Sequence, residues 1–175
     1  MRGLERLSSI RRSTPVMAAA LPDLPMPQTV MVRLIRITVA GMTQYFEPIF
    51  RAMGLTENSF HVLCLLMATD LGQASPSELS DLVGTGRANM TRIIEELIGA
   101  GHVSRTSAPR DARRQIIQIT ETGRALALAT VPRMVEPLER AFSGLSGAEF
   151  AQLDGLLRKL IRSFDNDAVP LDASA

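Results

Sequence analysis

The sequence predicts a mainly α-helical protein with one small β-hairpin, and two observations within residues 75–120 predict it. Two short stretches with helical apolar spacing are joined by Gly84-Thr85-Gly86, a tight turn. A short strand, an Arg-rich tip that contains a proline, and a returning strand follow directly. A helix pair followed by a basic hairpin is the layout of a winged helix-turn-helix.

Length and composition fit one folded domain. The chain has 175 residues, of which 46% are hydrophobic, so it can bury a substantial core. Its net charge is only +1, so overall charge does not indicate a nucleic-acid partner. Aromatic residues make up 4% and Trp is absent, which disfavours a stacking surface for single strands. A single Cys fits a reducing cytoplasm, and no apolar run is long enough for a membrane span.

Residues 1–27 are predicted to be a disordered N-terminal extension. They contain four arginines and then four prolines, and no secretory apolar segment follows the basic start. Two alternatives remain open: an organelle transit peptide, or an over-extended start with Met17, Met26 or Met31 as the true beginning.

Helical spacing and end signals predict the helices that follow. A helix over residues 28–53 ends at Gly54, which suits the left-handed conformation, and Thr56 can cap a second helix over residues 57–69. Ser75-Pro76-Ser77-Glu78 favours a capping box, with the proline in the first helical turn.

The next predicted helix covers residues 87–99, and its two faces differ in character. The side predicted to be buried consists of Met90, Ile93, Ile94, Leu97 and Ile98. The opposite side consists of Arg87, Ala88, Asn89, Arg92 and Glu96.

Strands are predicted over residues 103–106 and 115–119, with a solvated loop over residues 107–114 between them. Thr120 begins a long helix that runs through Phe142, and a second capping box at Ser146 begins the last helix. Residues 166–175 are predicted to be a flexible tail. The last helix has a long apolar stripe at heptad-like spacing, formed by Phe150, Leu153, Leu156, Leu157, Leu160, Ile161 and Phe164.

The charge distribution favours DNA as the partner of the central stretch. From residue 84 to 124 there are seven arginines and four acidic residues, an excess of three in a chain whose total is one. A helix in the major groove uses its N-terminal residues on base edges, where Asn89 could pair with adenine, and Arg87 or Arg92 with guanine or phosphate. The small side chain of Ala88 would allow a close approach of the backbone.

The hairpin tip suits a minor groove, whose negative potential attracts arginine. Its candidate contacts are Arg110, Arg113 and Arg114, and Asp111 could orient the Arg113 guanidinium through paired hydrogen bonds. The alternative is that Asp111 stabilises the turn and the arginines are solvated.

Residues 28–165 resemble the MarR family of transcriptional regulators. The most specific resemblance is an Asp-x-Arg wing at residues 111–113 that runs into Thr-Glu-x-Gly at residues 120–123. The other matching segments are Leu55-Thr56, Ser77-Glu78-Leu79-Ser80 with Leu82, and Met90-Thr91-Arg92-Ile93-Ile94-Glu95-Glu96-Leu97 with Gly101.

The resemblance implies a homodimer that binds double-stranded DNA. Residues 55–120 would form the DNA-binding lobe, and the helical dimerisation region would come from the N- and C-terminal helices over residues 28–54 and 121–165. Two-fold symmetry implies a pseudopalindromic operator with half-sites about 10 bp apart. The residues carried over are Arg113 in the minor groove, Asp111 orienting it, and Ala88, Asn89, Thr91 and Arg92 in or beside the major groove. Gly86-Arg87 departs from the Ser or Thr that opens this helix in many members.

The expected function is a cytoplasmic transcriptional regulator, in particular a repressor, that a small aromatic or phenolic ligand releases from DNA. Tyr45 and His61 are the candidate polar groups for that ligand. The alternative is a winged-helix dimer that serves as a protein-interaction or architectural module without a ligand response.

We expect no enzyme activity, cofactor, metal site or membrane partner. The sequence contains no Gly-rich phosphate loop and no nucleophile elbow, and one Cys with two His falls short of a structural zinc site. Cys64 lies within an apolar run, which favours an inert buried thiol over a peroxide sensor.

Overall fold

The structure is a computed structural model that describes residues 3–108 and 111–166, with side chains described for residues 3–107 and 115–164. It divides into two compact units, Met1–Met134 and Val135–Ala175, and each is described by itself. The elements are α1 (Gly3–Ala20), α2 (Met26–Ala52), α3 (Glu57–Met67), β1 (Gln73–Ala74), α4 (Pro76–Val83), α5 (Arg87–Gly99), β2 (Val103–Ala108), β3 (Asp111–Ile119), α6 (Glu121–Phe142) and α7 (Gly147–Asn166).

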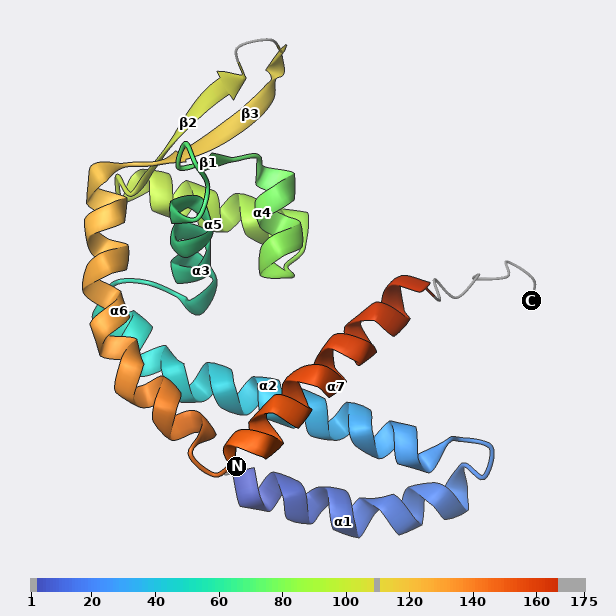
Figure 1. Cartoon of the computed structure of the whole chain (residues 1–175). Coiled ribbons are helices and arrows are strands. Elements are labelled where there is room, and N and C mark those ends of the chain that lie inside the picture. Colours follow the sequence, from blue (N-terminus) through green and yellow to red (C-terminus); the bar gives the residue numbers. More distant parts are fainter. Residues whose placement is uncertain (1–2, 109–110, 167–175) are drawn as a thin grey trace, which may run out of the picture. The chain divides into compact units, whose positions relative to one another are not determined.

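The first unit contains the core of a winged helix-turn-helix, with α3, α4 and α5 packed beside a three-stranded sheet (Figure 1). Leu63, Leu79, Ile93 and Ile117 come from four different elements, and each is 0% exposed. Burying a side chain of this size contributes about 1.5–3 kcal/mol. The helix pair and the hairpin therefore share one core, and the predicted fold class is confirmed.

The sheet is longer and has one more strand than the sequence predicted. β1 pairs with β3 through Gln73–Gln118 and Ala74–Ile117, and the strand order is β1-β3-β2. The predicted loop over residues 107–114 was wrong in most of its extent, because β2 runs to Ala108 and β3 begins at Asp111. Backbone pairing needs no apolar side chain, so a hairpin whose inner register is set by buried residues extends into a polar segment.

The predicted caps at Thr56 and Ser75 and the left-handed Gly54 are confirmed, whereas α3 ends at Met67 instead of residue 69 and α2 begins at Met26 instead of residue 28. Thr56 and Ser75 each form a capping box with the residue three positions later, and Gly84 adopts the left-handed conformation at φ 69°. At the start of α6, the Thr120 hydroxyl accepts a hydrogen bond from the Gly123 amide at 3.1 Å. These caps set where each helix begins and hence where its side chains point.

The expectation of a disordered extension over residues 1–27 differs from the structure, in which most of this segment is helix α1. Ile10 is buried, and α1 packs along α2 as an antiparallel pair (Figure 1). Arg33 on α2 also donates a hydrogen bond from Nη2 to the Ser13 hydroxyl at 2.8 Å. The four prolines concealed the signal, which was the spacing of Leu4, Leu7 and Ile10.

The second unit includes the end of α6 and all of α7. The rings of Phe142 and Phe150 meet edge to face at a centroid distance of 5.4 Å. Most of the predicted apolar stripe of α7 is exposed in the single chain, including Leu156, Ile161 and Phe164. Across the described residues, none of the helices combines the length and apolar character that a membrane crossing requires.

Gly123 provides a test of how α6 packs at its start. A Cβ placed there would lie 2.1 Å from the His102 carbonyl oxygen, so we expect Gly123→Ala to lower the free energy of unfolding by about 1–3 kcal/mol. Gly99→Ala is the matched control, because nothing lies within 4 Å of a Cβ there and alanine favours helix. Urea unfolding at one protein concentration measures the free energy of unfolding of both variants. An equal change in the two variants would contradict this packing.

Candidate nucleic-acid interface

The α4–α5 turn is anchored to the core by a buried serine. The Ser80 hydroxyl donates a hydrogen bond to the Thr85 carbonyl at 2.6 Å, and the Thr85 amide donates to the Ser80 carbonyl at 3.0 Å. Gly86 precedes α5 and offers no side-chain cap. The first amides of α5 therefore have no side-chain acceptor from Gly86, and an anion such as a phosphate is favoured at this end of a helix.

Helix α5 has one buried and one exposed face, as predicted. Met90, Ile93, Ile94 and Leu97 are at most 2% exposed. Five predicted site residues lie on the other side of the helix. Asn89 is half-buried, and the other four are exposed, namely Arg87, Ala88, Thr91 and Arg92. The structure thus brings these five residues together on one surface.

A chain of hydrogen bonds runs along the exposed face of α5. Asn89 Nδ2 donates to the Thr85 hydroxyl at 2.8 Å, and Asn89 Oδ1 accepts from Arg92 Nη2 at 3.0 Å. Arg92 Nη1 also forms an ion pair with Glu96 one turn later. The Thr91 hydroxyl donates to the Arg87 carbonyl at 3.0 Å. Arg92 is therefore held through both of its Nη atoms, by Asn89 and by Glu96.

The hairpin is joined to α5 by an ion pair that the sequence does not predict. Arg105 on β2 donates from Nη2 to the Glu95 carboxylate at 2.5 Å, and both side chains are partly exposed. Residues ten apart in different elements give no periodic signal, so only the fold reveals this contact. An exposed pair of this kind contributes at most about 1 kcal/mol, so it orients the hairpin more than it stabilises it.

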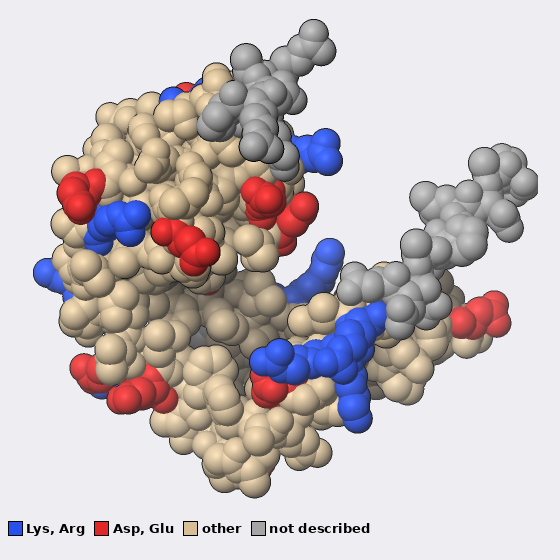
Figure 2. All heavy atoms as spheres, turned by 45° about the horizontal axis from the view of Figure 1, so that its top comes forward, with Lys and Arg blue, Asp and Glu red and all other residues tan. Residues whose placement is uncertain are grey.

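The remaining predicted contacts of the hairpin lie outside the described side chains. Arg110 is outside the described residues, and only the backbone of Asp111, Arg113 and Arg114 is described, as part of β3. Figure 2 shows basic and acidic side chains interspersed among the described residues of one face.

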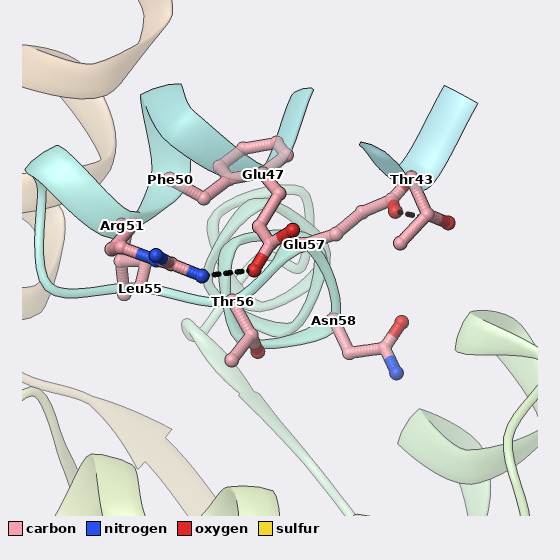
Figure 3. A pocket seen from close by; sticks show the side chains of 8 residues that line it. All are labelled: Thr43, Glu47, Phe50, Arg51, Leu55, Thr56, Glu57 and Asn58. Carbon is pink, nitrogen blue, oxygen red and sulfur yellow. Dashed lines mark hydrogen bonds and ion pairs between the residues drawn. The ribbon is translucent and has the colours of Figure 1, made fainter. Parts of the chain in front are cut away.

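A pocket of about 520 Å³ lies where α2 meets the start of α3 (Figure 3). Phe50 and Leu55 supply its apolar surface, and polar groups surround them. Glu47 pairs with Arg51, and the Thr43 hydroxyl donates to Glu57 at 3.3 Å. The full lining is Thr43, Glu47, Phe50, Arg51, Leu55, Thr56, Glu57 and Asn58.

The two residues that the sequence suggested for ligand contact do not line this pocket. Tyr45 is exposed on α2 and packs edge to face against Phe46 at 5.0 Å. Two positions along a helix correspond to about 200° of rotation, so Tyr45 points away from the side that carries Thr43. His61 lies one turn further along α3 and is exposed. The i, i+4 spacing of Glu47 and Arg51 does not locate the pocket, because the pairs Glu136–Arg140 and Asp154–Arg158 have the same spacing and do not line it.

Comparison with known proteins shows to which family this chain belongs. Residues 55–114, from α3 into β3, match the MarR family. The transcriptional repressor MprA of Escherichia coli (strain K12) is 30% identical over 154 residues, which cover 86% of this chain and 88% of MprA. The repressor NicR of Pseudomonas putida is 31% identical over 157 residues, covering 89% of this chain and 98% of NicR. The chain belongs to the MarR family.

A solved structure supports the same assignment. BpsR of Bordetella bronchiseptica, whose DNA binding is regulated by 6-hydroxynicotinic acid, is 28% identical, with a TM-score of 0.66. The match covers 73% of this chain and 89% of BpsR. The protein is accordingly a DNA-binding transcriptional regulator, and its family is one of regulators rather than enzymes.

The only cysteine of this MarR-family chain is Cys64, which is half-buried on α3 beside the core. Burial raises the pKa of the Cys64 thiol, since desolvation disfavours the thiolate. A raised pKa lowers the fraction of reactive thiolate at neutral pH, which disfavours activation toward oxidants.

We therefore expect Cys64 to react slowly with iodoacetamide. Only the thiolate reacts, so the alkylation rate rises with pH as the thiol ionises. For Cys64 we expect this rise at higher pH than for a free cysteine. Mass spectrometry of samples quenched between pH 7 and 10 measures the rate, with glutathione as the reference. Alkylation of the folded protein as fast as that of glutathione at pH 7 would show an activated thiol.

Proposed function

We propose that this regulator is a repressor that binds a pseudopalindromic operator as a homodimer. The observation that supports it best is the exposed surface of α5, where a basic, hydrogen-bonding set of side chains is held on a rigid core. MprA and NicR, its relatives over most of the chain, are both named repressors. A protein of this kind acts where its DNA is, and we place it in the cytoplasm.

Helix α5 would enter the major groove with its N-terminal half. Arg87 and Arg92 are long enough to reach guanine or phosphate, and Ala88 lets the backbone come close. Thr91 lies on the same exposed face. Six phosphate contacts or more would make binding steeply dependent on salt.

The hairpin would place Arg113 in the adjacent minor groove. Asp111 would hold the guanidinium of Arg113, and Arg110 and Arg114 would lie beside the phosphates. The Arg105–Glu95 ion pair supports this geometry, because it links β2 of the hairpin to the helix that would read the major groove.

Dimerisation would use the helices at the two ends of the domain. The exposed apolar side chains of α7 favour a second protein surface over water, as do Met31, Val32 and Val39 on α2. Two copies related by a two-fold axis would present two α5 helices to half-sites about 10 bp apart.

The pocket between α2 and α3 is our candidate effector site. Its size suits a small molecule, and its apolar surface with nearby hydroxyl and amide groups suits an aromatic or phenolic compound. The regulation of BpsR by 6-hydroxynicotinic acid, a hydroxylated aromatic acid, supports this ligand class.

Arg113→Ala tests the repressor proposal. We expect operator affinity to fall by at least ~1 kcal/mol through loss of the minor-groove contact, while the dimer persists. The operator is first selected from random duplexes with the wild-type protein, and fluorescence anisotropy then measures affinity. Arg12→Ala, an exposed arginine on α1, is the matched control, and analytical ultracentrifugation reports the dimer. Wild-type binding without sequence preference would favour the architectural alternative.

Thr43→Trp tests the pocket. The larger side chain should fill it, so that 6-hydroxynicotinate or 4-hydroxybenzoate no longer releases the protein from its operator, while binding without the compound is unchanged. Tyr45→Phe is the comparison, because Tyr45 does not line the pocket. If Tyr45→Phe abolishes release and Thr43→Trp does not, the effector binds elsewhere. If neither compound acts on the wild type, the ligand class is wrong.

A further inference from the structure

We propose that Asn89 is a positioning residue that aims Arg92 at DNA, and that it does not read a base itself. This inference rests on the proposed role of α5 as the DNA-reading helix. It starts from the amide of Asn89, whose two ends are both engaged within the protein.

The orientation of that amide follows from its partners. Arg92 has only donors, so the Asn89 oxygen must face it, and the nitrogen then faces the Thr85 hydroxyl, an available acceptor. Thr85 lies four residues before Asn89 and Arg92 three residues after it, so the amide is held along the axis of α5.

Direct reading of adenine needs a different arrangement. The amide oxygen would accept from adenine N6 while the nitrogen donates to N7, with both pointing at one base edge. Turning the Asn89 amide to this geometry breaks the bonds to Thr85 and Arg92 together. Arg92 would then lose one of its two restraints at the moment when it has to bind.

Arg92 is the side chain that gains from the present arrangement. Its guanidinium lies between Asn89 and Glu96, which use two of its five N–H donors and leave three for a base or phosphate. An arginine fixed before binding loses less conformational freedom in the complex.

The restraint on Arg92 extends back into the core. Ser80 is 4% exposed and holds the Thr85 carbonyl, Thr85 holds Asn89, and Asn89 holds Arg92. The buried end of this chain is rigid, so its exposed end has a defined position.

The test compares base preferences across variants. With the selected operator and a panel of its single-base substitutions, Kd is measured for the wild type, Asn89→Ala, Arg92→Ala and the double variant. We expect Asn89→Ala to weaken binding roughly two- to tenfold. It should also flatten preference at the same base pairs as Arg92→Ala and add little in the double variant. Thr85→Val, which removes only the hydroxyl, should have a smaller effect at those base pairs.

The opposite result is equally distinct. If Asn89→Ala erases preference at an adenine that Arg92→Ala still reads, or if the two losses multiply, Asn89 reads a base and the proposal is wrong. Asn89→Asp guards against a folding defect, because aspartate can still accept from Arg92 and Thr85 but cannot donate to adenine N7. It should keep the preference set by Arg92. Failure of the wild type to select any sequence would instead refute the proposed function.

Discussion

The fold depends on a single apolar stripe along α5, formed by Met90, Ile93, Ile94 and Leu97. This stripe packs against α3, α4 and β2, and the packing fixes the rotation of α5 about its own axis. Rotating the helix by about 100°, one residue position, would bring a polar side chain into the core in place of a buried isoleucine. The exposed face is therefore decided by the core. The DNA contacts proposed for that face would need no further interaction to orient the helix.

A second constraint fixes the hairpin relative to α5. The Thr120 hydroxyl donates to the Gly101 carbonyl at 2.7 Å, and the Thr122 hydroxyl donates to the same oxygen at 2.7 Å. Gly101 ends the turn after α5 at φ 73°, so these bonds tie the end of α5 to the start of α6. β2 and β3 begin and end at this junction, and the close approach of Gly123 to His102 leaves no room for a side chain there.

The sequence predicted those features of the fold that interactions between neighbouring residues determine. Capping boxes at Ser75 and Ser146, the left-handed Gly54 and the two faces of α5 each follow from a few neighbouring residues, and the structure has them all. It missed α1 because prolines interrupt that segment's helical signal, and it did not predict strand β1 or the Arg105–Glu95 pair, since each depends on contacts between segments distant in sequence. The same holds for the pocket, and for the use of both ends of Asn89 inside the protein, which only the positions of Thr85 and Arg92 reveal.

A net charge of +1 limits the non-specific electrostatic attraction between this protein and DNA. Non-specific attraction grows with the number of phosphates neutralised, and a local excess of three charges supplies little of it. Glu95 and Glu96 would reduce it further, because they pair with Arg105 and Arg92 on the surface that we propose faces DNA. A surface of this kind would bind DNA weakly at any sequence whose hydrogen-bond acceptors do not match the donors of the protein. In the proposed dimer, doubling this surface would raise affinity only where two half-sites are correctly spaced, so weak individual contacts would favour specificity over strength.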